Sequence, residues 1–150
     1  MHASEMAEDF PVIGVEDDAW TAVTQLAENR LPGLVVTDEA GQPLSILPTS
    51  QVLRVLVPTY VQDDPSLAGV LTESMADRMC ERLRGKKVRA LLRDDMPELA
   101  VVRGDDTIIE VAAVMARLRC PLAVVMRGQE RVGVITASRL LQLALKPAPE

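Results

Sequence analysis

The stretch VIGVEDD at positions 12–18 recurs as AVVRGDD at positions 100–106. In this alignment the two acid pairs, Asp17-Asp18 and Asp105-Asp106, lie 88 residues apart. From this register one copy covers residues 10–60, the second covers residues 98–146, and residues 61–97 connect them. A chain that repeats itself in this way predicts a fold, a binding site and an approximate symmetry that come in pairs.

Each copy has the same predicted order of elements. An apolar stripe at helical spacing follows each acid pair and predicts an amphipathic helix with an acidic N-cap. Short apolar runs follow Pro32 and Pro121 and predict buried strands. Gly-Gln turns at Gly41 and Gly128 then predict hairpins. With a final helix in each copy, we expect an α/β (α+β) fold of two β-α-β-β-α repeats packed with pseudo-twofold symmetry.

The closing helices are predicted over 50–56 and 137–145, and the prolines that follow, Pro58 and Pro147, are expected to end them. The connecting segment predicts one further helix of about five turns, from an N-cap at Asp64 to a stop at Gly85. Its apolar stripe recurs at every fourth residue. We expect this stripe to pack on the body of the module, and a partner surface is the alternative. The stripe consists of Leu67, Leu71, Met75, Met79 and Leu83.

Composition narrows the class of protein. With 48% hydrophobic residues and a mean hydropathy of +0.13, the 150-residue chain is not disordered. Aromatic residues make up only 2%, which argues against nucleic acid as a partner because a single-stranded nucleic-acid binder needs several stacking rings. The N-terminus is acidic and no apolar run is long enough to span a bilayer, which predicts a cytoplasmic protein without membrane insertion. Cys80 and Cys120 are expected to be free thiols.

The net charge of −6 is unevenly distributed. Residues 10–60 hold six acids and two bases, a net charge of −4, whereas residues 98–146 hold five acids and seven bases, a net charge of +2. Six of those seven bases are arginines, which suit a phosphorylated ligand if they converge. Arginines scattered over the surface are the alternative. The six are Arg103, Arg117, Arg119, Arg127, Arg131 and Arg139.

Catalysis has little support in the sequence. The only histidine is His2, in an N-terminus expected to be mobile, so no nucleophile-histidine arrangement is available within the folded body. Adjacent acids at a helix start are far more often caps than catalytic pairs or metal ligands. We therefore predict no enzyme activity and no metal site.

The paired pattern resembles the CBS domain family, and the two copies together resemble the tandem arrangement called a Bateman module. Three features carry the resemblance: the acid pair before an apolar helix, Arg-x-Pro before the central strand, and a Gly-h-h-Thr-x-x-Asp turn, where h is apolar, into the closing helix. That turn reads GVITASR at 133–139 and SILPTSQ at 45–51. Met6 and residues 88–92 match the lead-in segment that the family places before each first strand.

The resemblance implies a regulatory module that binds adenosine-containing ligands between its repeats. In such a turn the Thr and the first helical amides face an anion, and the carboxylate accepts from the ribose hydroxyls. This chain departs from the pattern because Gln51 and Arg139 replace the carboxylate and Pro48 replaces the first Thr. Copy one is therefore expected to be a poor site. For copy two, the predicted ligand-binding residues are Val102, Arg119, Pro121, Gly133, Val134, Thr136 and Arg139.

Two functions follow from the resemblance and its departures. The first is a stand-alone sensor that binds an adenosine-containing or other phosphorylated small molecule and regulates a separate enzyme or transporter. AMP, ADP, ATP or S-adenosylmethionine would be regulatory ligands, with no cofactor required. The alternative is a ligand-free dimerisation or docking module. The family analogy predicts a homodimer for both.

Overall fold

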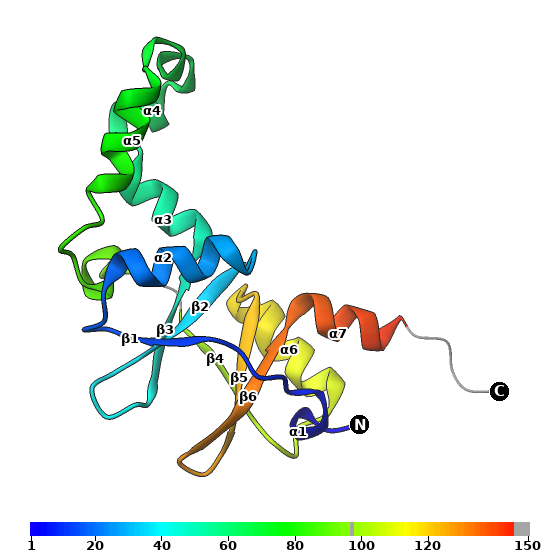
Figure 1. Ribbon diagram of the computed structural model, residues 1–150. Coiled ribbons are helices and arrows are strands. Elements are labelled where there is room, and N and C mark those ends of the chain that lie inside the picture. The colour runs from blue at the N-terminus through cyan, green and yellow to red at the C-terminus, as the bar shows by residue number, and fades with distance from the viewer. Residues whose placement is uncertain (97, 146–150) are drawn as a thin grey trace.

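The computed structural model describes residues 1–96 and 98–145, and it contains the two predicted β-α-β-β-α repeats (Figure 1). Lys146 and Pro147, the predicted end and helix stop of copy two, lie outside the described residues. Repeat 1 consists of β1 (Val12–Gly14), α2 (Ala19–Glu28), β2 (Gly33–Thr37), β3 (Pro43–Pro48) and α3 (Thr49–Leu56). Repeat 2 consists of β4 (Ala100–Arg103), α6 (Ile108–Leu118), β5 (Leu122–Arg127), β6 (Glu130–Thr136) and α7 (Ala137–Ala144).

Both repeats form a three-stranded sheet with one topology. The first strand is parallel to the second, and the second is antiparallel to the third. The hairpin loops turn at Gly41 (φ +83°) and Gly128 (φ +63°), where a positive φ favours glycine. The predicted α+β fold class is therefore confirmed.

The register of the acid pairs differs from the predicted one. Asp17 accepts a hydrogen bond from the Gly14 amide at 2.8 Å, and Asp106 accepts the equivalent bond from the Arg103 amide at 2.8 Å. Asp18 caps α2, whereas the equivalent cap of α6 is Thr107. The offset of 88 is therefore wrong for this part of the repeat, where equivalent residues lie 89 apart.

The offset changes in the hairpin. Five residues separate the paired Thr37 and Pro43 in repeat 1, but four separate Met126 and Arg131 in repeat 2. Beyond the hairpin, equivalent residues lie 88 apart. The sequence alone did not reveal this one-residue difference. Each copy has two adjacent acids, so Asp17 aligns with an aspartate at an offset of 88 (Asp105) as well as at 89 (Asp106).

The two lead-in segments are exchanged between the repeats. The short helix α1 (Ala3–Met6) precedes repeat 1 but packs on repeat 2, where the Ala3 amide donates to the Asp106 carbonyl at 2.8 Å. The 3₁₀ helix η2 (Val88–Leu91) precedes repeat 2 but packs on repeat 1, where the Val88 amide donates to the Asp17 carbonyl at 2.8 Å.

His2 belongs to the first of these segments. It pairs with Thr107 in an antiparallel bridge, which places His2 against repeat 2, and the mobility of the N-terminus stays a prediction. Lys87 and Asp18 form the equivalent bridge in the other lead-in. The exchange joins the repeats because each copy is completed by chain that precedes the other.

The sheets also share a core. Successive residues of a strand face opposite sides, so Leu34 and Val36 pack among the helices of repeat 1 while Val35 faces the other way. Val35 and Ile46 join the apolar cluster of repeat 2 and pack the two sheets against each other (Figure 1). This contact is the common core that the two small sheets needed.

The prediction of one five-turn connecting helix is wrong. The segment forms α4 (Thr59–Asp63), the 3₁₀ helix η1 (Pro65–Val70) and α5 (Glu73–Glu81). Asp64 caps η1 as a helix start, but the backbone is extended at Leu71, and Thr72 begins a new helix by accepting from the Met75 amide. A second capping residue inside the apolar stripe therefore divides the helix.

The expected packing of the stripe on the body is also wrong. α4, η1 and α5 form an arm that projects from the two repeats (Figure 1). No residue of η1 or α5 is buried, and within the stripe only Leu83, after α5, reaches the core.

Candidate functional site

Three of the predicted ligand-binding residues lie inside the protein. Val102 and Val134 are 2% and 1% exposed. Gly133 lies under the chain that follows α1, because the Glu8 and Val134 amides each donate to the other residue's carbonyl at 2.9 Å. A Cβ at Gly133 would lie 2.8 Å from the Glu8 carbonyl oxygen. Val102 is therefore buried on β4, and Gly133 and Val134 lie on an edge of β6 that the chain after α1 covers.

Thr136 and Arg139 lie at the start of α7. The Thr136 hydroxyl accepts from the Arg139 amide at 3.0 Å and so caps the helix. The Arg139 guanidinium lies 3.0 Å from a Glu8 carboxylate oxygen and also donates to Gln142 at 3.3 Å. The protein's own carboxylate thus lies where the sequence predicts a ligand anion.

The equivalent position in repeat 1 has a similar role. Gln51 is buried, and its side-chain amide donates to the Leu91 carbonyl at 3.1 Å. Leu91 belongs to the lead-in η2, just as Glu8 follows the lead-in α1. Gln51 and Arg139, which replace the family's carboxylate, therefore each hold a lead-in segment.

Arg119 and Pro121 lie together in a groove between the repeats, with a volume of about 710 Å³. Pro32, Pro48 and Ser50 of repeat 1 face them across it. Pro32 and Pro121 are equivalent residues of the two copies, so the groove lies where the pseudo-twofold axis brings the copies together. Its other walls are small or apolar residues of repeat 2, namely Ala112, Met115, Ala116, Cys120, Ala137, Leu140 and Leu141.

Arg119 is the one charged residue in the lining of this groove. It ends α6 in the left-handed conformation (φ 52°), and its equivalent Arg30 has the same conformation (φ 50°). A non-glycine residue in this conformation is strained, which marks the position as one that the surrounding structure constrains. The guanidinium is exposed and can meet an anion that enters the groove.

Sequence reasoning missed the contribution of repeat 1 and of α6 to this groove. Pro48 was expected only to weaken the site of copy one by replacing its Thr, yet it forms a wall of the groove. The duplicated Arg-x-Pro motif could have indicated this groove. Equivalent residues of two repeats related by a twofold axis can lie close together at that axis.

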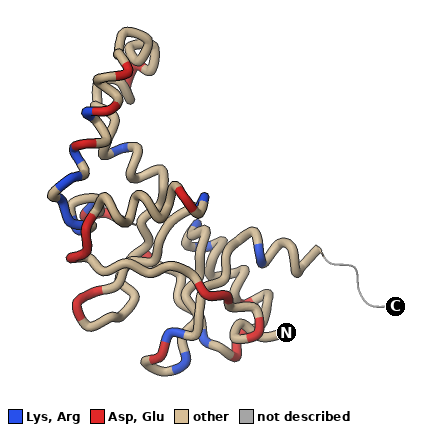
Figure 2. The backbone as a smooth tube through the Cα atoms, viewed as in Figure 1, with Lys and Arg blue, Asp and Glu red and all other residues tan. Residues whose placement is uncertain are grey.

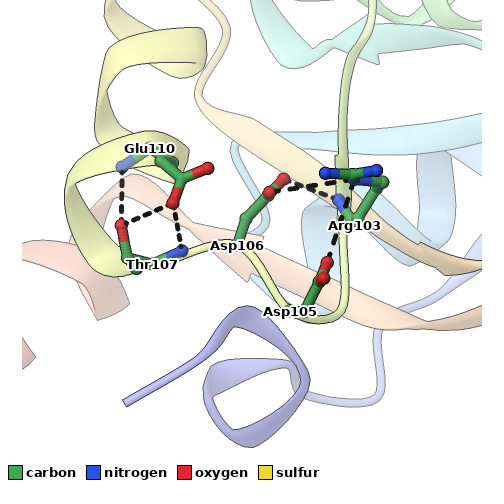
Figure 3. A network of polar contacts seen from close by, with 5 residues as sticks. All are labelled: Arg103, Asp105, Asp106, Thr107 and Glu110. Atoms are coloured by element: carbon green, nitrogen blue, oxygen red, sulfur yellow. Dashed lines mark hydrogen bonds and ion pairs between the residues drawn. The ribbon is translucent and has the colours of Figure 1, made fainter.

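The arginines of repeat 2 do not converge on one site. A second hollow of about 410 Å³ contains Arg103 and Arg127 together with His2, Ser4 and Asp105. Arg103 is 3.8 Å from Asp105 and 4.0 Å from Asp106, next to the capping box of Thr107 and Glu110 (Figure 3). Arg131 reaches the Gly41 carbonyl of the other hairpin at 3.5 Å. The positive charge is therefore divided among several separate contacts.

These features define a tandem α+β repeat module with a groove between its halves. The CBS domain profile matches residues 3–58 and 88–146, so both matches begin at a lead-in segment. The chain therefore belongs to the CBS domain family, as a tandem pair. None of the helices in residues 1–96 and 98–145 has both the length and the apolar character needed to cross a bilayer.

Solved structures agree with this assignment. A CBS domain-containing protein of unknown function from Kribbella flavida is 57% identical, with 97% of this chain and 100% of that chain covered and a TM-score of 0.84. The CBS-pair protein CBSX2 from Arabidopsis thaliana is 17% identical, with 96% and 94% covered and a TM-score of 0.71. CBSX2 in complex with AMP is 16% identical, with 96% of each chain covered and a TM-score of 0.66. Among curated proteins no sequence matches.

Proposed function

We propose that this chain is a non-catalytic regulatory module that senses an adenosine-containing or other phosphorylated small molecule in the groove between its repeats. The groove carries the proposal. Its volume of about 710 Å³ is within the usual size range of small-molecule sites, and its walls are apolar apart from Arg119 and Ser50. Such walls suit a flat base, and the guanidinium suits a phosphate.

The nature of the ligand follows from this chemistry and from the family. CBSX2 has the same fold and has been solved with AMP, which makes AMP the first ligand to test. ADP, ATP and S-adenosylmethionine share the adenosine group and come next. In this proposal the module acts in the cytoplasm as a homodimer, requires no cofactor, and regulates a separate enzyme or transporter.

One observation favours a ligand-free docking module instead. Both positions where the family has a carboxylate for the ribose hydroxyls make contacts within the protein: Gln51 donates to the Leu91 carbonyl, and Arg139 forms an ion pair with Glu8. A module whose sites are closed in this way would serve only to dimerise or to dock. The two functions differ in whether the protein gains stability from a small molecule.

Thermal unfolding with AMP, ADP, ATP, NAD or S-adenosylmethionine at millimolar concentration separates them. A ligand at one hundred times its Kd stabilises the folded protein by about 2.7 kcal/mol. For a chain of this size that corresponds to a rise in Tm of roughly 5–10 °C. The absence of a shift with all five compounds would reject the sensing function for these ligands.

Variants on α6 then test the location of the site. Ala116→Trp fills the groove and should abolish the shift, whereas Ala113→Trp, exposed on the same helix outside the groove lining, should preserve it. Arg119→Gln should weaken a phosphorylated ligand about ten- to a hundredfold, because a charge-assisted hydrogen bond is lost. Arg117→Gln is the matched control. A shift that survives Ala116→Trp but disappears in Arg139→Ala would move the site to the start of α7.

A further inference from the structure

The arm formed by α4, η1 and α5 exposes apolar surface that nothing in the described chain covers. Val70 is 76% exposed and Tyr60 is 55% exposed. A hollow of about 280 Å³ between the start of α4 and α5 is lined by Pro58, Tyr60, Met75 and Met79 together with Arg78 and Arg82. By contrast, α2 buries Ala19, Ala22 and Leu26 against its own repeat. The arm therefore has an apolar face available for another molecule.

Charge is sharply divided along the arm. Residues 57–77, which include its tip, hold four acids and no Lys or Arg, a net charge of −4. Residues 78–87, which return to the body, hold five bases and one acid, a net charge of +4. Figure 2 shows the acidic residues toward the end of the arm and the basic run where it joins the repeats. The arm is thus electrically complementary to a copy of itself in the reverse direction.

Contacts within the chain leave this complementarity unused. Glu81 pairs with Arg84, and Lys87 pairs with Glu16. Among residues 1–96 and 98–145, however, neither Arg78 nor Arg82 has a carboxylate within 4 Å, and the acids Asp63, Asp64, Glu73 and Asp77 have no ion pair. Asp64 accepts from Ser66 as the cap of η1 and Arg82 donates to the Leu56 carbonyl at 3.4 Å, but neither contact neutralises the charge of the side chain, which a partner of opposite charge can still meet.

We propose that the arms of two copies of this chain pair side by side in opposite directions. The acidic tip of each arm, with Asp63, Asp64, Leu67 and Val70, meets the hollow that Arg78 and Arg82 help to line on its partner. A twofold axis makes both contacts at once, so the interface is closed and self-complementary. The proposal rests on the self-association included in the proposed function and assigns it to a particular surface.

Sedimentation of the full chain at tens of micromolar and low salt tests the pairing. The base reversal Arg78→Glu/Arg82→Glu should halve the mass of the wild-type assembly. The tip reversal Asp63→Lys/Asp64→Asn should do the same, and its asparagine can still cap η1. A control that reverses two exposed cations outside the arm, Arg117→Glu/Arg127→Glu, should retain the wild-type mass. Raising the salt to 1 M should weaken the wild-type assembly, because exposed charges are then screened within about 3 Å.

Mixing the two reversed variants gives the sharpest test. In a mixed pair the acidic tip of one variant faces the intact basic segment of the other, and the charges introduced at position 63 of one and at positions 78 and 82 of the other are also opposite. A 1:1 mixture should therefore recover the doubled mass that neither variant forms alone. Circular dichroism of each variant checks that the fold is retained.

The possible outcomes test the homodimer and the arm pairing separately. A wild-type chain that stays monomeric overturns both the homodimer and the arm pairing. Reversed variants that keep the wild-type mass, or a mixture that does not recover it, overturn the arm pairing alone. Neither result bears on the ligand panel, which tests the groove separately.

Discussion

The two repeats differ most at the turn into their closing helices. In repeat 1 this turn contains Pro48 and the buried Gln51, and in repeat 2 it contains Thr136 and Arg139. A neutral amide holds one lead-in through a carbonyl oxygen, and a guanidinium holds the other through a carboxylate. The comparison shows that one structural task, holding the exchanged lead-in, is met by different chemistry in each copy.

The largest expected effect on stability comes from adding a methyl group at Gly133. In Gly133→Ala the new Cβ would lie 2.8 Å from the Glu8 carbonyl oxygen and 3.0 Å from the Ala7 Cβ, so the lead-in must move away from β6. We expect a loss of about 1–3 kcal/mol and a decrease in Tm of several degrees, measured by thermal unfolding.

The equivalent residue in repeat 1 is the matched control. Ser45 already carries a Cβ, and the one hydrogen bond of its hydroxyl within residues 1–96 and 98–145 goes to the neighbouring Ile46 carbonyl, at 3.3 Å. Ser45→Ala should therefore change Tm much less. If Gly133→Ala melted within a degree of the wild type, the packing of the lead-in on β6 would be in error.

A smaller effect is expected from giving repeat 1 the helix cap of repeat 2. Pro48 precedes α3 without a side-chain hydrogen bond, whereas Thr136 caps α7. Pro48→Thr should stabilise the protein by about 0.5–1 kcal/mol, and Thr136→Ala should destabilise it by about 1 kcal/mol. Denaturant unfolding of both variants measures the two changes. A Pro48→Thr variant that is less stable than the wild type would show that the proline matters for another reason.

The smallest expected effect depends on pH. The Glu16 carboxylate accepts from Lys87 and Arg89, both at 2.8 Å, and these hydrogen bonds lower its pKa below the usual 4.5. A lowered pKa in the folded state gives a stabilisation that is complete above the unfolded value and is lost as the pH falls through the folded value. The lead-in η2 should therefore dock less firmly in acid.

Hydrogen exchange of the Val88 and Arg89 amides at pH 7 and at pH 3.5 checks this expectation. Protection should decrease at the lower pH in the wild type, after correction for intrinsic exchange. Glu16→Gln should show weaker protection at pH 7 and little further loss at pH 3.5. Equal pH dependence in both proteins would exclude Glu16 as the cause. The other lead-in has a carboxylate of its own, Glu5, whose pKa is lowered by the hydrogen bond from the His2 amide, so the comparison with Glu16→Gln is what assigns the loss at Val88 and Arg89 to Glu16.

The sequence predicted the repeated elements well because they depend on local signals. Helical spacing after Asp18, glycines that permit positive φ at Gly41 and Gly128, and prolines before each central strand act within a few residues. The connecting helix was mispredicted because a regular apolar stripe outweighed a single cap at Thr72. The one-residue difference between the hairpins was missed because two adjacent acids allowed either register.

The candidate site was less predictable. Arg119 and Pro121 could be chosen from the sequence, and they line the groove, but Val102, Gly133 and Val134 lie inside the protein. Whether a strand residue faces a cleft depends on the segment that covers it. For Gly133 that segment is the chain around Ala7 and Glu8, more than one hundred residues earlier.

The sequence by itself determined the duplication, the order of elements in each copy and the family, because these follow from short-range patterns written twice. Only the tertiary structure decided that the lead-ins are exchanged, that Gln51 and Arg139 hold them, and that a groove opens between Pro32 and Pro121. These features depend on contacts between segments far apart in the chain, and no local spacing specifies which distant backbone or carboxylate will meet a given side chain.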